Sequence, residues 1–384
     1  MSAADFLVIG SGIAGASIAC ELALHARVII AEQEDRHGYH TTGRSAAMYI
    51  ESYGASAVRR LTVASRAFFD APPVGFADYP LLDPRGCLTI ARADQDAALA
   101  AVADQITATG SAWRELAGAE ARDMVPALRP EAVARALFEP DSADIDVNAL
   151  HQGFLRLAKA RGAELRLDAR VISLDRVGGG WRAILAGGDS IEAGAIVDAA
   201  GAWADGVAAM AGIAPLGLIP KRRTAILIDP PPGVPTEAWP TVIDVAEQFY
   251  FKPQSGFILA SPGDATPSQP VDAAPEELDV AVCVDRIQAA ADIPVRRVAR
   301  AWAGLRTFAP DSIPVIGYDP RTAVFFWFAG QGGYGMQTAP AAARLGAALA
   351  LRRGIPAELA NRGVSAEEFS PTRFRAAPGT GRRR

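Results

Sequence analysis

Six residues near the N-terminus have the types and the spacing that bind a dinucleotide. The run Gly10-Ser11-Gly12-Ile13-Ala14-Gly15 matches the pattern G-x-G-x-x-G. In this pattern the first glycine allows a tight turn, the second lets the backbone approach a pyrophosphate, and the third lets a helix pack closely against a strand. Glu32 follows where a carboxylate can accept hydrogen bonds from ribose hydroxyls. These residues predict a dinucleotide site, and Glu32 suits the adenosine ribose of NAD and of FAD equally.

A strand, a helix and a second strand must surround this pattern, and the sequence predicts all three. Residues 5–9 have the pattern of a buried strand, residues 16–24 that of a helix, and residues 27–31 that of a second buried strand. The N-terminus of the helix offers backbone N–H groups and the positive end of a dipole to phosphates. We therefore expect a Rossmann-like domain. A glycine-rich turn in another kind of α/β domain is the alternative.

A second glycine-rich run, residues 330–335, also fits G-x-G-x-x-G but predicts a different structure. It follows a strand-like stretch, residues 323–329, and precedes a long alanine-rich helix, residues 336–351. Because no second strand and acid come after that helix, we exclude a second Rossmann domain and a half that NAD(P)H would reduce. A helix N-terminus with bare backbone around it would suit negative charge on a ligand. The alternative is a helix that packs on its strand, with glycines at the turn.

Sheet patterns occupy much of the chain between these two runs. Residues 181–185 and 190–193 flank a Gly-Gly-Asp turn, and residues 195–197 form a strand that ends in small residues. From residue 216 to residue 302, strand-like runs alternate with loops, as in an antiparallel sheet. We therefore predict the α/β fold class, a Rossmann-like domain with an inserted antiparallel-sheet (α+β) domain. The expected ranges are 1–78, 145–215 and 303–370 for the first domain, 79–144 and 216–302 for the inserted domain, and 371–384 for a flexible tail.

The composition limits the classes of protein that the chain can represent. The 384 residues carry 38 Lys and Arg against 43 Asp and Glu, a formal net charge of −5, which argues against nucleic acid as a partner. Cys20, Cys87 and Cys283 form no C-x-x-C pair, so neither a disulfide framework nor a structural metal is expected. No stretch approaches the roughly 18 apolar residues of a membrane span, and no signal-peptide pattern is present. We expect a cytoplasmic protein without a transmembrane segment.

A series of segments, taken in order along the chain, resembles one superfamily of flavoenzymes. Besides the glycine-rich start, the segments are Gly38–Ala47 (GYHTTGRSAA), Ser142–Leu150 (SADIDVNAL), Pro220–Arg223 (PKRR), Phe249–Pro253 (FYFKP), Ala303–Arg306 (AGLR) and Gln331–Gln337 (QGGYGMQ). In this order they resemble the D-amino-acid oxidase and glycine oxidase superfamily, most of all its FAD-dependent D-amino-acid dehydrogenases such as D-arginine dehydrogenase. The resemblance covers nearly the whole chain.

The resemblance implies that the dinucleotide is FAD. The positions that it places against FAD are Gly10, Gly12, Ile13, Ala14, Gly15, Glu32, Gln33, Thr41, Thr42, Arg44, Ser45, Ala46, Val171, Ala200, Gly201, Trp203, Gly304, Gly333, Tyr334, Gly335, Met336 and Gln337. From the residues alone, segment 38–47 could equally be a helix-capping loop with a solvated Arg44. No cysteine stands near Gly304 or Gly335, where related sarcosine oxidases attach their flavin, so we expect non-covalent FAD.

The resemblance also implies a site for an amino-acid substrate. Arg222 and Arg306 match arginines that face the substrate carboxylate, whose two oxygens a planar guanidinium can bind at once. Tyr53 and Tyr250 match hydroxyl donors at the same end of the substrate, and Gly332 matches a backbone carbonyl that orients the amine. As alternatives, Arg222 could be one solvated charge in a basic run, and the tyrosines could lie at the edge of a core.

A further set of positions is expected around the substrate side chain: Met48, Ile50, Cys87, Thr241 and Ile243. Family members that select a guanidinium carry a carboxylate at the position of Cys87 and polar groups at those of Met48 and Ile50. Without that carboxylate a cationic side chain would lose its partner. Asp244 is near, but strand alternation should direct it away from Ile243. We therefore expect neutral, hydrophobic D-amino acids to be preferred over D-Arg and D-Lys.

The activity implied by the resemblance is FAD-dependent oxidative deamination of D-amino acids. The α-hydrogen passes as a hydride to flavin N5, and the imino acid hydrolyses to a 2-oxo acid and ammonia. The expected partners are the small amino-acid substrate and an electron acceptor, either oxygen or a quinone. Two alternatives remain. One is a glycine or sarcosine-type secondary-amine oxidase, and the other, of a different class, is a non-catalytic FAD-binding subunit.

Overall fold

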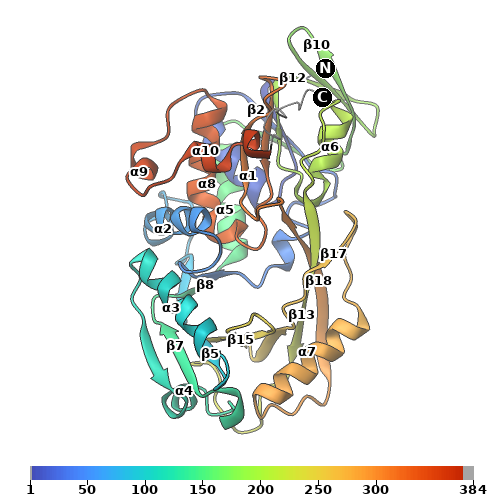
Figure 1. The fold of residues 1–384 in the computed structure, drawn as a ribbon. Coiled ribbons are helices and arrows are strands. Elements are labelled where there is room, and N and C mark those ends of the chain that lie inside the picture. The colour runs from blue at the N-terminus through green and yellow to red at the C-terminus, as the bar shows by residue number, and fades with distance from the viewer. Residues whose placement is uncertain (1, 375–384) are drawn as a thin grey trace, which may run out of the picture. The chain divides into compact units, whose positions relative to one another are not determined.

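The computed structural model describes residues 2–374, and these group into two compact units. The first unit contains described residues 2–38, 151–219 and 307–374, and the second contains residues 39–150 and 220–306. Residues 39–78 group with the second unit, so this partition differs from the expected domain ranges. The ligand that each expected domain binds stays a prediction. Figure 1 shows the chain and labels many of its elements.

The first unit contains an eight-stranded sheet with parallel strands at its centre. The order is β10-β11-β12-β1-β2-β9, with β20 beside β12 and β19 beside β20. β1 pairs in parallel with β12 and β2, while β10, β11 and β12 form an antiparallel meander. The strands are β1 (Ser2–Ile9), β2 (Val28–Ala31), β9 (Glu164–Arg166), β10 (Val171–Val177), β11 (Gly180–Leu185), β12 (Ser190–Asp198), β19 (Val315–Tyr318) and β20 (Phe325–Ala329).

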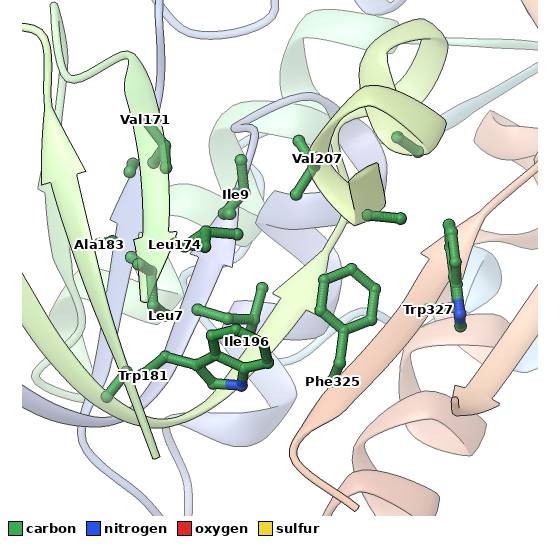
Figure 2. Packing of buried hydrophobic residues seen from close by; sticks show 14 of the residues in the cluster. Leu7, Ile9, Val171, Leu174, Trp181, Ala183, Ile196, Val207, Phe325 and Trp327 are labelled. Carbon is green, nitrogen blue, oxygen red and sulfur yellow. The ribbon is translucent and has the colours of Figure 1, made fainter. Parts of the chain in front are cut away.

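Helices and a large apolar cluster bury this sheet. The helices are α1 (Ile13–Leu22), α5 (Val147–Ala160), α6 (Ala204–Met210) and α8 (Gly335–Ala350). α8 packs beside α1 (Figure 1), and a Cβ on Gly346 would lie 2.8 Å from the Phe328 ring and 3.0 Å from Ile18, so only glycine permits this approach. Leu7, Ile196 and Phe325, from three neighbouring strands, meet Trp181 of β11 and Val207 of α6 in the cluster of Figure 2.

Two predicted boundaries in this unit were wrong for local physical reasons. The helix expected from residue 16 begins at Ile13, directly after its N-cap, Gly12. The two strands expected at residues 190–193 and 195–197 form one strand, β12. Gly194 lies in the middle of β12, where a Cβ would stand 2.9 Å from the Asp5 carbonyl oxygen. This glycine therefore allows close pairing with β1 and does not end the strand.

The second unit contains a nine-stranded mixed sheet. The order is β17-β13-β16-β15-β14-β5-β7-β6, with β18 beside β13. The sheet is not purely antiparallel, because β5 and β14 pair in parallel between antiparallel neighbours. The strands are β5 (Cys87–Ala91), β6 (Arg114–Ala117), β7 (Arg135–Glu139), β13 (Ile219–Ile228), β14 (Thr241–Asp244), β15 (Tyr250–Gln254), β16 (Phe257–Ser261), β17 (Thr266–Pro267) and β18 (Val298–Phe308).

One face of this sheet is covered by α7 (Glu277–Ala290). Leu88, Val242 and Phe251 lie on adjacent strands and share a core with Cys283 and Ile287 of α7, so we call this side the α7 face. Smaller elements complete the unit. They are the sheet β3 (Met48–Tyr49), β8 (Ala143–Ile145) and β4 (Leu82–Pro84), and the helices α2 (Ser56–Asp70), α3 (Asp96–Thr109) and α4 (Gly118–Met124).

The C-terminal part of the described chain is ordered further than expected. Pro371–Phe374, the start of the predicted flexible tail, form a 3-10 helix. Arg373 in this turn forms an ion pair of 2.7 Å with Asp311 and donates to the Ile313 carbonyl oxygen at 2.6 Å. The rest of the predicted tail, residues 375–384, lies outside the described residues. Among the residues described, no helix is both long enough and apolar enough to cross a membrane.

Candidate functional site

The first G-x-G-x-x-G run forms the loop between β1 and α1. Gly10 has φ +100°, and a Cβ there would lie 2.6 Å from the Ala199 carbonyl oxygen. A Cβ on Gly15 would lie 1.9 Å from the Gly10 carbonyl oxygen. Both positions therefore require glycine. The N-cap of α1, Gly12, has no side-chain cap, so the start of the helix, with Ile13 and Ala14, presents bare backbone, as a phosphate-binding helix does.

Glu32 is held against this loop. It follows β2 and is buried, and its Oε2 accepts hydrogen bonds from Ser11 N at 2.8 Å and Ser11 Oγ at 2.6 Å. Its Oε1 accepts from Glu34 N at 3.1 Å, and the side chain of Gln33 donates to Glu34. The carboxylate thus stands beside the glycine loop at the end of β2, the place where an acid binds a nucleotide ribose.

His151 on α5 supports the same loop, and the sequence analysis missed it. Its Nε2 lies 2.7 Å from the Ser11 carbonyl oxygen in a buried contact. Burial lowers the pKa of His151 to about 4, so the ring is neutral at pH 7. Because a carbonyl oxygen only accepts, Nε2 carries the proton and donates it. No local sequence pattern marks this role, since the contact joins residues 140 positions apart.

The other positions expected near FAD in this unit lie where strands end. Ala200 follows β12, and Gly201, with φ +57°, begins a 3-10 helix that ends at Trp203. Tyr334 is the N-cap of α8, which follows β20 and begins at Gly335 without a side-chain cap, and Met336 and Gln337 are buried in its first turn. These segments and the first glycine loop all follow the carboxyl ends of parallel strands, where open α/β sheets bind ligands. Val171 begins β10 and its side chain belongs to the core, so the expected place of its backbone beside FAD stays a prediction.

Gly332, expected to orient the substrate amine, has a fixed backbone in the second glycine run. Its φ is +55°, and a Cβ would lie 2.5 Å from the Phe308 ring, so only glycine fits. Its N–H donates to the Thr307 carbonyl oxygen at 2.8 Å. Gly333 follows it in the turn before α8. The role of the Gly332 carbonyl stays a prediction.

In the second unit, the segment expected along FAD is fastened to β18. Thr41 Oγ1 donates to the Leu305 carbonyl oxygen at 2.6 Å, and Arg44 donates to the Ala303 carbonyl oxygen at 3.1 Å. Arg44 also forms an ion pair with Asp272, so it is not the solvated side chain of the alternative interpretation. A Cβ on Gly304 would contact Arg44 at 3.5 Å. The segment itself is a 3-10 turn from Thr42 to Arg44, followed by Ser45 and Ala46.

The face of the nine-stranded sheet opposite α7, which we call the site face, collects the expected substrate residues. The register pairs Tyr250 with Ile243, and Thr241 with Cys87. Side chains of a strand alternate between faces, so all four share the site face, while Val242 lies on the α7 face. Met48 also reaches this face, because Thr241 Oγ1 lies 3.3 Å from its sulfur. Ile50 is buried, and Asp244 lies on the α7 face, opposite to Ile243 as expected.

Arg222 does not lie with these residues. It occupies the α7 face, where its Nη2 is 2.9 Å from the carboxylate of Asp279 on α7 and its Nη1 forms an ion pair with Glu276. The prediction for this strand is displaced by one residue, since alternation directs Arg223 to the site face. The sequence contained a signal for this placement. Ile226 and Ile228 belong to the apolar core on the α7 face, and Arg222, an even number of residues before them on the same strand, must point to that face too.

Arg223 and Arg306 instead form a cationic group with the two tyrosines. Arg306 Nη1 lies 3.4 Å from Tyr53 Oη, and Arg223 interacts electrostatically with Arg306, Tyr250 and Tyr53. Burial lowers the pKa of Arg223, and the positive charge of Arg306 lowers it further. Its Nε donates to the Asp264 carbonyl oxygen at 2.6 Å, which fixes the guanidinium. We call Arg223, Arg306, Tyr53 and Tyr250 the carboxylate site, since this group suits an anion.

The surroundings of Cys87 are more polar than the sequence suggested. Cys87 is buried, which raises the pKa of its thiol, and its cross-strand partner on β7 is Glu139, which is 4% exposed. The neighbour of Thr241 on β15 is Lys252, 2% exposed, which forms an ion pair with Asp144. Sequence reasoning missed these neighbours because they depend on which strands pair.

Comparison with known proteins assigns the family. The chain matches the model of the family described as FAD dependent oxidoreductase (DAO) over residues 5–349. The chain belongs to this family. Glycine oxidase of Geobacillus kaustophilus (strain HTA426) is 24% identical over 383 residues, which cover 93% of this chain and 95% of that protein.

Solved structures of similar fold include proteins that are named for different substrates. The crystal structure of the Geobacillus kaustophilus glycine oxidase has a TM-score of 0.82 at 23% identity, with 99% of this chain and all of that chain covered. L-proline dehydrogenase from P. horikoshii has a TM-score of 0.80 at 22% identity, with 97% and 98% covered. L-alpha-glycerophosphate oxidase from Mycoplasma pneumoniae, solved with FAD bound, has a TM-score of 0.83 at 17% identity, with 91% and 95% covered.

FAD is therefore the cofactor of this FAD dependent oxidoreductase, and the residues described fit it. The first unit offers a glycine-only loop, a buried acid and two bare helix N-termini at the carboxyl ends of the parallel strands of its sheet. These groups suit a pyrophosphate, a ribose and a flavin that becomes negative on reduction.

Proposed function

We propose that this FAD dependent oxidoreductase deaminates D-amino acids oxidatively, neutral and hydrophobic ones ahead of cationic ones. The carboxylate site carries the proposal. Two guanidinium groups close enough to repel each other, with tyrosine hydroxyls beside them, gain from an anion between them. An α-carboxylate supplies that charge and two oxygens for bidentate binding.

In the proposed reaction the chain mainly binds and orients the substrate. Arg223 and Arg306 hold the carboxylate, Tyr53 and Tyr250 donate to it, and the Gly332 carbonyl orients the amine, which loses its proton before oxidation. Bound FAD supplies the redox chemistry by accepting the α-hydrogen with its two electrons. The imino acid then takes up water to give a 2-oxo acid and ammonia. Positioning and a fixed electrostatic field are the contributions of the protein.

The preference for hydrophobic side chains rests on Met48 and Ile243, which lie on the site face and carry no charge, and on Ile50, which is buried. The preference for the D-enantiomer rests on the resemblance of the sequence segments to D-amino-acid dehydrogenases. A second candidate, a glycine or sarcosine-type secondary-amine oxidase, is favoured by the match with glycine oxidase along nearly the whole chain.

Anaerobic mixing of the purified holoenzyme with D-Leu, L-Leu, D-Arg and sarcosine, each in turn, tests the proposal. We expect D-Leu to bleach the absorbance of the oxidised flavin, L-Leu to leave it unchanged, and D-Arg to act more slowly. Faster bleaching by sarcosine would favour the secondary-amine oxidase. If none of the four bleaches the flavin, the enzyme assignment to amino acids fails.

A further inference from the structure

Glu139 is a buried carboxylate that the proposed chemistry does not use. It ends β7, and its pairing with Cys87 places it on the site face. Ser52 Oγ donates to Glu139 Oε1 at 2.9 Å, and Ser52 itself is only 8% exposed. A carboxylate is costly to bury without hydrogen bonds, so this contact stabilises both partners. The two residues are 87 positions apart, and their bond ties a loop to the sheet.

That loop carries Tyr53 of the carboxylate site. The N–H of Tyr53 bonds to the Ile50 carbonyl oxygen at 3.3 Å in a turn. Just after it, the Gly54 carbonyl oxygen accepts from Arg59 Nη1 of α2 at 2.8 Å. The loop is thus held on one side by Ser52 and Glu139 and on the other by α2. Tyr53 stands between these two anchors.

We infer that Glu139 is a positioning residue that holds Tyr53 beside Arg306 through Ser52. The inference rests on the proposed carboxylate site. Consecutive Cα atoms are 3.8 Å apart, so a displaced Ser52 displaces Tyr53. The contact between Tyr53 Oη and Arg306 Nη1 is 3.4 Å, near the upper limit for a hydrogen bond. A small shift therefore removes it.

The charge state of Glu139 gives the inference a second readout. Burial raises the pKa of Glu139 to about 7; the bond from Ser52 lowers it, and the charge of Glu51 raises it. Glu51 on the loop and the Cys87 thiol on β5 both act electrostatically with Glu139. An ionised carboxylate accepts a stronger hydrogen bond than a neutral one. The tie to Ser52 should therefore tighten as the pH rises through neutrality.

A double-mutant cycle tests the inference. The holoenzymes of Ser52→Ala, Glu139→Gln and the double variant are compared with wild type for kcat and KM with D-Leu, and for the dissociation constant of benzoate as a carboxylate probe. We expect each single change to raise KM and the benzoate constant by about 3–10-fold, as for one lost hydrogen bond, with kcat within about twofold. The double variant should be no worse than the worse single variant. Ser52→Thr, which keeps the hydroxyl, should restore binding.

A control and a pH series sharpen the result. Ser65→Ala removes another buried hydroxyl, which bonds within α2 to the Leu61 carbonyl oxygen at 2.8 Å, and should change neither constant. The KM of the wild-type enzyme should fall as the pH rises through about 7, because Glu139 becomes ionised. The KM of Glu139→Gln should fall less over the same pH range. Additive losses in the two single variants would overturn the inference. If wild type oxidises no amino acid, the proposed function fails, and benzoate binding still decides the role of Glu139.

Discussion

At the scale of single residues, the adjacent arginines Arg222 and Arg223 point to opposite faces of the sheet, and substitution of each should have a different effect. Arg223→Lys keeps a charge in the carboxylate site but loses the planar group that binds two oxygens. We expect KM for D-Leu to rise about 10–100-fold, as for a lost charged hydrogen bond, with kcat changed less. Steady-state kinetics of the purified variant provide the measurement.

The neighbouring substitution is the matched control. Arg222→Lys retains a cation beside Asp279 and Glu276 on the α7 face, so KM should change by less than about threefold, while the thermal midpoint falls slightly. A larger rise of KM in Arg222→Lys than in Arg223→Lys would indicate that Arg222 binds the substrate carboxylate and would contradict the argument from strand register.

At the scale of elements, α5 supports the first glycine loop through one hydrogen bond. His151→Leu leaves the buried Ser11 carbonyl oxygen without this donor, which costs about 1–3 kcal/mol. We expect weaker FAD binding by about 5–100-fold, measured by titration of the apoprotein with FAD. Gln152→Leu removes the adjacent contact to His37 and should retain FAD affinity. Equal affinity of His151→Leu and wild type would show that the loop does not need this support.

The same scale shows how far the sequence predicts the fold. Strands and helices follow from periodicity, so β1, β2, β20 and α8 lie within a few residues of their expected bounds. The pairing of strands that are distant in the sequence does not follow from periodicity. β5 and β14, for example, are far apart in the sequence but adjacent in the sheet. For that reason the glycine loop was predicted from its local pattern and Arg306 from the resemblance of its segment to the flavoenzymes, while Glu139 and Lys252 were not predicted. The placement of Arg222 on the α7 face is a different case, because the parity of Ile226 and Ile228 indicates it once one residue of the strand is anchored to a face.

At the scale of the whole molecule, one buried acid makes stability depend on pH. Asp198 is fully buried at the end of β12, and its Oδ2 has no hydrogen-bond partner among the described residues. Burial raises the pKa of Asp198 well above its usual 3.8, and the nearby Asp205 raises it too. Between these two pKa values the folded protein holds a proton that the unfolded chain has released. The free energy of unfolding therefore falls as pH rises through this window.

Asp198→Asn removes that titration while keeping the shape of the side chain. We expect the thermal midpoint of the variant to exceed that of wild type by about 2 °C or more at pH 8, given roughly 2–4 °C per kcal/mol in a domain of this size, and to match it near pH 4. Asp205→Asn should instead lower the thermal midpoint, because it weakens the hydrogen bonds that the Asp205 carboxylate accepts from the N–H groups of Leu216, Gly217 and Leu218. Parallel pH profiles for Asp198→Asn and wild type would show that Asp198 is already neutralised by a partner, and the pH dependence of the whole molecule would then arise elsewhere.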